Sequence, residues 1–249
     1  MNRDQDAFGH ALYDYQQSGG KDPWAIVIER DDGMVDADDA RNYFAEYADW
    51  PAHQQQAMAF AQGRVLDVGC GAGRHSLHLQ GKGFDVLGMD ESPLAIETCR
   101  LRGLEHTRVM SITRVSSKLG PFDTILMLGN NLGLFANPVR ARWLLRRFEA
   151  MTSPNARIIA ETREPHQTAE PWHFEYHERN RRRGRWPGQV TIRVRYRDYA
   201  TPWFDYLFVS REELQQLVEH TGWVVERLVD SEDTSYLAIL AKASRRVRP

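Results

Sequence analysis

The feature that most constrains the fold of this chain is an alternation of short apolar segments with helical segments between residues 64 and 161. The helical segments carry start signals. At 92–93 and again at 137–138, a residue that caps helices precedes a proline, whose missing N–H costs nothing in the first helical turn. Strands that alternate with helices form parallel sheets buried on both faces, so the pattern predicts an α/β fold with a doubly wound, mostly parallel sheet. The predicted strands cover residues 64–68, 84–89, 107–112, 122–128 and 156–161.

The remaining segments depart from this alternation. Residues 163–209 are polar and rich in arginine and aromatic residues, and they contain strand patterns at 190–196 and 203–209. Because this insert is too small for a core of its own, we expect a small inserted substrate cap within a single domain of residues 1–249. Residues 1–61 are predicted to form an N-terminal helical lid. Two last strands are predicted at 224–229 and 236–240.

Composition excludes several classes of protein. The chain has 249 residues, a formal net charge of −2 and two cysteines, so it has neither a global basic field for nucleic acid nor a disulfide framework. No long apolar stretch or secretory signal occurs. We therefore expect a cytoplasmic protein without membrane contact and without a bound metal.

A glycine-rich turn follows the first predicted strand. Gly69, Gly71 and Gly73 let the backbone approach a ligand closely, and Asp90 ends the next strand, where an acid can accept hydrogen bonds from two ribose hydroxyls. The dinucleotide fingerprint would need a glycine at Arg74, and the carboxylate of Asp67 suits a cationic ligand better than a pyrophosphate. The residues indicate an adenosine ligand other than NAD.

Residues 65–73, Asp90 and residues 122–128 together resemble the motifs of class I S-adenosylmethionine-dependent methyltransferases. The resemblance implies a Rossmann-like, seven-stranded sheet, methyl transfer from S-adenosyl-L-methionine, and S-adenosyl-L-homocysteine as product. It departs at Ser111, where the family usually has an acid. The cofactor contacts that it implies are Asp67, Gly69, Gly71, Gly73, Asp90, Glu91, Ser111, Ile112, Leu128, Tyr43 and Tyr47.

Candidate catalytic residues follow from what methyl transfer needs, which is a positioned nucleophile and, for some acceptors, removal of a proton. Asn130 follows the fourth predicted strand and can position a polar nucleophile, or it only caps the loop. His173 and His177 stand four residues apart and are candidate general bases, or polar surface residues of the cap. No third metal ligand has convincing spacing.

Candidate substrate-binding residues lie beside Asn130 and in the cap. Along residues 190–197 the arginines alternate with apolar residues, so one strand face is cationic and suits an anionic substrate. The same arginines alternatively pair with acids such as Glu212, Glu213 or Glu226. The predicted contacts are Asn131, Tyr176, Arg193, Arg195, Trp203 and Tyr206.

The sequence favours a methyltransferase that acts on a small molecule, one with an anionic group. Two alternatives stay open, namely an enzyme that methylates RNA or a peptide through the arginine-rich cap, and a protein that binds S-adenosylmethionine without turnover. The acceptor, the choice of O-, N- or C-methylation, the use of a general base and the oligomeric state are left undetermined.

Overall fold

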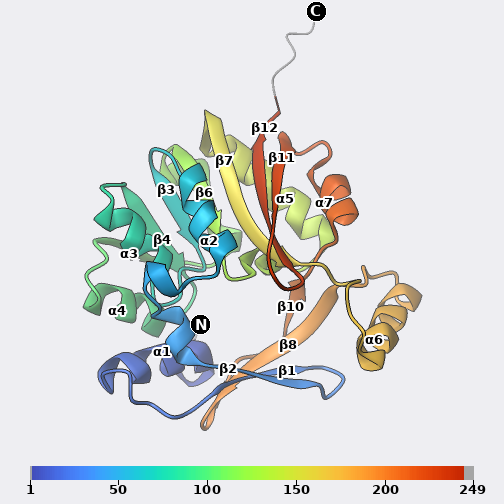
Figure 1. Cartoon of the computed structure of the whole chain (residues 1–249), viewed down its shortest axis with the longest axis horizontal. Helices are drawn as coiled ribbons and strands as arrows, with labels where there is room; N and C mark the ends of the chain where they lie inside the picture. The colour runs from blue at the N-terminus through green and yellow to red at the C-terminus, as the bar shows by residue number, and fades with distance from the viewer. Residues whose placement is uncertain (1, 244–249) are drawn as a thin grey trace, which may run out of the picture.

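The computed structural model of the chain describes residues 2–243. Its larger sheet has seven strands in the order β11-β12-β7-β6-β3-β4-β5 (Figure 1). Strands β5, β4, β3, β6 and β7 run parallel, whereas β12 and β11 are antiparallel additions at the β7 edge. This confirms the predicted doubly wound, mostly parallel sheet. The strands are β3 (Val65–Val68), β4 (Val86–Asp90), β5 (His106–Val109), β6 (Phe122–Met127), β7 (Thr152–Arg163), β11 (Trp223–Asp230) and β12 (Ser235–Lys242).

Helices cover both faces of this sheet because successive side chains of a buried strand point to opposite faces. Leu66 of β3 packs in one apolar cluster with α5 and α7, and Val65 packs in another with α2 and α3. The helices are α2 (Ala52–Ala57), α3 (Arg74–Gly81), α4 (Pro93–Leu101), α5 (Pro138–Ala150) and α7 (Arg211–Val218).

The predicted helix starts are present. The hydroxyl of Ser92 accepts a hydrogen bond from the Ala95 N–H, and the side chain of Asn137 accepts one from the Arg140 N–H. Helix α7 also starts with a capping box of Ser210 and Glu213. Such caps satisfy backbone donors that the first helical turn leaves free.

A second, antiparallel sheet with the order β10-β8-β1-β2 lies at the carboxyl-terminal end of the parallel strands (Figure 1). Its central strands join the N-terminal segment to the insert, because Ile28 of β1 pairs with Val194 of β8. The insert is therefore completed by N-terminal strands, and the expectation of a helical segment over residues 1–61 misses β1 and β2. The strands are β1 (Ile26–Arg30), β2 (Val35–Asp38), β8 (Gln189–Tyr196), β9 (Tyr199–Ala200), which pairs with β8, and β10 (Phe204–Leu207).

Two helices flank the second sheet. Helix α1 (Ala7–Gln17) packs on α4 and on β8, and α6 (Pro171–Arg182) belongs to the insert. Within residues 2–243, no helix is long and apolar enough to cross a membrane. The 3-10 helices are η1 (Arg3–Gln5), η2 (Ala40–Tyr43), η3 (Tyr47–Asp49), η4 (Met58–Phe60), η5 (Ile112–Arg114), η6 (Ser117–Leu119) and η7 (Asn131–Phe135).

Candidate active site

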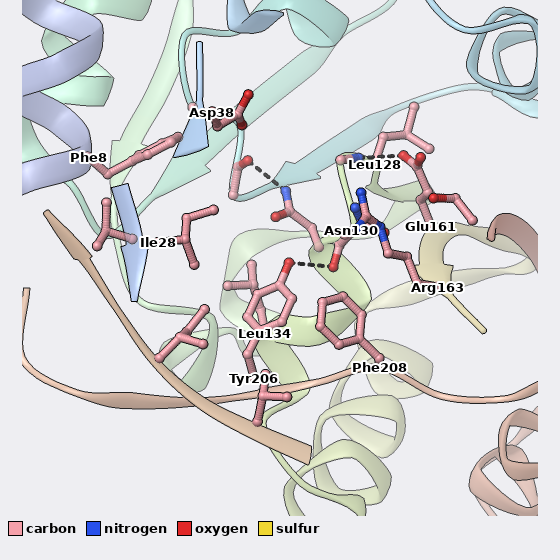
Figure 2. Close-up of a pocket in the computed structure, with 18 of the residues that line it drawn as sticks. Phe8, Ile28, Asp38, Leu128, Asn130, Leu134, Glu161, Arg163, Tyr206 and Phe208 are labelled. Carbon is pink, nitrogen blue, oxygen red and sulfur yellow. Dashed lines mark hydrogen bonds between the residues drawn. The ribbon is translucent and has the colours of Figure 1, made fainter. Parts of the chain in front are cut away.

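A cavity of about 1070 Å³ separates the carboxyl ends of the parallel strands from the second sheet. Figure 2 shows residues from both sheets pointing into it. Open α/β sheets bind ligands at this end of their strands. Thirteen of the predicted site residues line the cavity: Tyr43, Gly69, Gly71, Asp90, Glu91, Ser111, Ile112, Leu128, Asn130, Asn131, His173, His177 and Tyr206. Seven do not: Asp67, Gly73, Tyr47, Tyr176, Arg193, Arg195 and Trp203.

The glycine-rich turn is a close-packed backbone loop. Gly69 has a φ of +72°, and a Cβ there would lie 2.8 Å from Nδ2 of Asn131. That amide donates hydrogen bonds to the carbonyls of Val68 (3.1 Å) and Gly69 (2.8 Å). Asn131, predicted to contact substrate, lines the cavity and also holds the turn against the loop that follows β6.

Two acids lie beneath and beside this turn. Asp90 accepts hydrogen bonds from the backbone N–H groups of Gly71 (3.1 Å) and Ser92 (2.9 Å), and burial raises its pKa to about 6. Asp67 accepts the hydroxyl of Ser76 at 2.6 Å, and burial raises its pKa to about 6 as well. Because Asp67 faces α3 and not the cavity, the expectation of a direct ligand contact for it is not met.

Asn130 occupies an unusual position at the end of β6. Its φ of +63° lies in the left-handed region, and its carbonyl accepts the hydroxyl of Tyr206 at 2.5 Å. Its side-chain Oδ1 is buried and has no hydrogen-bond partner in the part of the chain that the structure describes. Buried acceptors are nearly always paired, so this atom is free to meet a donor from a ligand.

The comparisons with known proteins match this architecture. Residues 65–155 match the family of methyltransferase domains. A solved S-adenosylmethionine-dependent methyltransferase from Bacteroides fragilis, in complex with S-adenosyl-L-homocysteine, aligns with 98% of this chain and 97% of its own, with a TM-score of 0.82 and 25% identity. The chain contains an S-adenosylmethionine-dependent methyltransferase domain.

More distant relatives agree. Glycine/sarcosine N-methyltransferase of Halorhodospira halochloris is 25% identical over 168 residues, or 59% of this chain and 60% of that protein. The match thus spans about 60% of that relative's length. The CcbJ methyltransferase of Streptomyces caelestis shares the fold, with a TM-score of 0.60 over 82% of this chain and 98% of its own at 12% identity.

The methyltransferase has a cavity wall that fits its cofactor. The left-handed turn at Gly69 is a cradle that a Cβ would fill, and Met89 and Ile112 offer apolar surface beside Asp90. The Asp90 carboxylate accepts only two backbone donors and keeps capacity for hydroxyl donors, since an ionised carboxylate has about four acceptor sites.

Of the two tyrosines expected to contact the cofactor, Tyr43 lines the cavity and Tyr47 does not. Tyr43 lies edge-on to Phe8 with ring centroids 5.0 Å apart, and its hydroxyl donates to Asp38 at 2.7 Å. A Cβ on Gly71 would lie 3.7 Å from the Tyr43 ring, so this ring lies directly over the turn. Tyr47 stacks on His78 at 4.3 Å, outside the cavity.

Glu161, two residues before the end of β7, is a cavity residue that the sequence analysis missed. Its carboxylate accepts the N–H of Gly129 (2.6 Å) and the amide of Gln54 (2.8 Å), and it pairs with His53 Nε2 at 2.9 Å. The side-chain oxygen of Gln54 in turn accepts a 2.8 Å hydrogen bond from the guanidinium of Arg74. The network ties the N-terminal segment to the loop that follows β6 and, through Arg74, to the start of α3. The sequence did contain a signal for Glu161, because it is an acid at the end of a predicted apolar strand, as Asp90 is.

The two candidate histidines line the cavity but are weak bases. Burial and the neighbouring Arg30 guanidinium, 2.9 Å from its Nδ1, lower the pKa of His173. Burial and His166 lower the pKa of His177 to about 4. Both are therefore neutral near pH 7. Residues 2–243 contain no group of three His, Cys, Asp or Glu side chains arranged to hold a metal ion.

The cationic face of β8 points away from the cavity. Arg193 and Arg195 lie 2.8 and 3.6 Å from Glu29, and Arg193 stacks over Trp203 at 4.7 Å. The acid that pairs with them is Glu29 of β1 and not one of the three glutamates proposed from the sequence. The hydroxyl of Tyr176 donates to Asp31 at 2.7 Å, also outside the cavity.

Arg163 provides a cationic group inside the cavity instead. It ends β7 two residues after Glu161, so the two side chains share a strand face, and Figure 2 shows both pointing toward the loop of Asn130. Among the described residues, Arg163 has no acidic partner within ion-pair distance, whereas Arg30 pairs with Asp32 at 2.7 Å. Arg74 and Arg140 also line the cavity without an ion pair, but Arg74 donates hydrogen bonds to Gln54 and Asn42, and Arg140 donates one to the carbonyl of Leu134. Arg163 is therefore the cavity arginine of the described residues whose guanidinium has neither an ion pair nor a hydrogen-bond partner there.

Proposed function

We propose that this methyltransferase transfers the methyl group of S-adenosylmethionine to a small molecule with an anionic group, bound in the cavity between the two sheets. The observation that carries the proposal is Arg163, a cation on the cavity wall without an acidic partner in residues 2–243. A guanidinium binds a carboxylate through two parallel hydrogen bonds. The relative named for glycine and sarcosine supports it, since both of those acceptors carry a carboxylate.

The proposal assigns the cofactor to the half of the cavity beside β3 and β4. Asp90, with Glu91 beside it, accepts the ribose hydroxyls. Ser111 and Ile112 flank the adenine. The backbone at Gly69 and Gly71 lines the amino-acid end beneath Tyr43, and Leu128 lies along it toward Asn130.

The protein's task in the transfer is to position and enclose the reactants. S-adenosylmethionine supplies an activated methyl group on its sulfonium. Arg163 and Asn130 hold the acceptor so that its nucleophilic atom lies in line with that methyl, at about 3–3.5 Å. The second sheet excludes water from the reacting atoms.

The structure offers less support for a macromolecular acceptor. Along β8 the arginines proposed to grip a polyanion are already paired, with Arg193 and Arg195 beside Glu29 and Arg197 beside Asp14 and Asp22. A phosphate backbone would have to displace these carboxylates.

The proposal is tested first by calorimetry of S-adenosyl-L-homocysteine, with the Asp90→Ala variant as control, and then by a methyl-transfer assay over small amines, alcohols and thiols with and without a carboxylate. We expect turnover to concentrate in the carboxylates and to fall at least tenfold in Arg163→Met, with S-adenosyl-L-homocysteine affinity unchanged. Arg195→Met, outside the cavity, is the matched control. Turnover confined to neutral acceptors or to RNA contradicts the proposal.

A further inference from the structure

The inner face of the second sheet has an apolar patch, bordered on the same face by Arg30 of β1 and by Asp36 and Asp38 of β2. Ile28 on β1 pairs with Val194 on β8, and Ile192 on β8 pairs with Phe204 on β10, so these four side chains form one continuous surface. All four line the cavity. Leu134 from the core domain and Phe208 beyond β10 extend the surface (Figure 2).

This apolar surface lies next to the expected point of methyl transfer. The hydroxyl of Tyr206, on β10, holds the carbonyl of Asn130, so β10 is fixed directly against the loop that follows β6. The proposed cofactor contacts belong to the other side of that loop, on the ends of β3 and β4. The cavity therefore has room for an acceptor that begins at Asn130 and continues under the second sheet.

Among the polar side chains at this junction, Asn130 and Arg163 have groups without a partner in the described residues. Asn130 has a buried Oδ1 that has no donor among residues 2–243, and the Arg163 guanidinium forms no ion pair there, although its charge helps to lower the pKa of Asp233 on the same cavity wall. An N–H or O–H of the ligand would satisfy the first atom, and an anion would pair with the second. Both groups lie at one end of the apolar surface.

We infer that the acceptor is an amphipathic carboxylic acid, with an N–H or O–H nucleophile beside Asn130, a carboxylate on Arg163, and an apolar body of several carbons on the second sheet. The inference rests on the proposed function and narrows it. Glycine would occupy only the polar end and leave Ile28, Ile192 and Val194 against solvent. Removing that surface from water favours longer side chains, by about fourfold for each buried methylene.

The test uses the full chain loaded with S-adenosyl-L-homocysteine and a matched series of 2-amino acids, namely glycine, 2-aminobutyrate, norvaline and norleucine, with the corresponding 2-hydroxy acids. Calorimetry is expected to show affinity rising at least tenfold from the shortest to the longest member of one series. Hexylamine, which lacks the carboxylate, is expected to bind at least tenfold more weakly than norleucine.

Two variants separate the two ends of the ligand. Val194→Thr keeps the shape of the wall but makes it polar, so it is expected to flatten the dependence on chain length while S-adenosyl-L-homocysteine affinity stays unchanged. Arg163→Met is expected to weaken every member of the series by the same factor.

The outcomes separate this inference from the proposed function. If glycine binds and is methylated as well as norleucine, the amphipathic acceptor is wrong and the proposed function stands. If no carboxylic acid binds or is methylated while S-adenosyl-L-homocysteine still binds, both fail.

Discussion

The phenolic hydroxyl of Tyr206 donates a 2.5 Å hydrogen bond to the backbone carbonyl of Asn130. This contact joins the second sheet to the loop at the end of β6. It depends on a glycine, because a Cβ on Gly133 would lie 1.9 Å from the Tyr206 ring. The position of the second sheet and the conformation of the proposed catalytic loop are therefore set together.

Tyr206→Phe is expected to lower kcat several-fold without changing the affinity for S-adenosyl-L-homocysteine, because the loop loses its anchor while the cofactor half stays intact. Its stability should fall by about 1 kcal/mol, the usual net contribution of one hydrogen bond. Steady-state kinetics and urea unfolding measure both. Tyr176→Phe is the control, since that hydroxyl contacts Asp31 outside the cavity. It should lose stability but keep kcat, and an equal loss of kcat in both variants would argue against a special role for Tyr206.

Gly69→Ala is expected to weaken S-adenosyl-L-homocysteine binding at least tenfold. The residue has a φ of +72°, and the new Cβ would lie 2.8 Å from Asn131 Nδ2 and 2.9 Å from the Leu134 side chain. The turn must therefore move. Calorimetry measures the change, and Gly81→Ala is the control, because nothing lies within 4 Å of a Cβ in that helical position. Unchanged affinity in Gly69→Ala would show that the turn does not shape the cofactor site.

The buried pair of Glu161 and Gln54 should tolerate exchange better than single replacement. In Glu161→Gln a new amide donor faces the Gln54 amide, and in Gln54→Glu two carboxylates meet. In the double variant, the amide introduced at position 161 can donate to the carboxylate introduced at position 54, although the Gly129 N–H, which donates to the same Glu161 oxygen as Gln54, then loses its acceptor. The carboxylate introduced at position 54 can also accept from Arg74. We expect both single variants to be destabilised and the double-variant cycle to show a favourable coupling of about 1–3 kcal/mol. Chemical denaturation measures the cycle, and strictly additive effects would be the contrary result.

Stability and cofactor binding should depend on pH with opposite signs. The pKa values of Asp67 and Asp90 are raised by burial from 3.8 to about 6, so between these values the folded protein binds more protons than the unfolded chain. Their contribution to stability is therefore fully present below pH 3.8 and is lost as pH rises through about 6. The proposed ribose contact needs ionised Asp90, so affinity for S-adenosyl-L-homocysteine should increase as pH rises through about 6 and then level off.

Unfolding curves between about pH 3.5 and 7 and calorimetry between about pH 5 and 8 test this pair of trends, since each range brackets the change expected for it. The Asp90→Asn variant should bind more weakly, and its affinity should vary less with pH. A wild-type affinity that stays constant between about pH 5 and 8 would mean that ionisation of Asp90 is not coupled to binding of S-adenosyl-L-homocysteine.

Local signals in the sequence determined much of the core. The alternation of apolar strands with capped helices predicts the parallel sheet, because the caps at Ser92 and Ser210 and the burial of each strand are decided by neighbouring residues. The glycine-rich turn and Asp90 are similarly local, since a left-handed backbone and the end of a strand are visible in the order of residues. Their place beside the cavity follows from the parallel sheet alone.

Only the tertiary structure decided the acceptor side. Ile28 pairs with Val194, Arg193 with Glu29, and Glu161 with His53, and each of these partners lies more than about a hundred residues away in the chain. A strand pattern shows which side chains share a face, but it does not show which face is covered or which acid lies opposite an arginine. The alternation along β8 was therefore visible in the sequence. Which face of β8 lines the cavity was not, because it depends on the pairing of β8 with β1. The same holds for the arginines, since Arg163 lines the cavity and Arg193 and Arg195 do not.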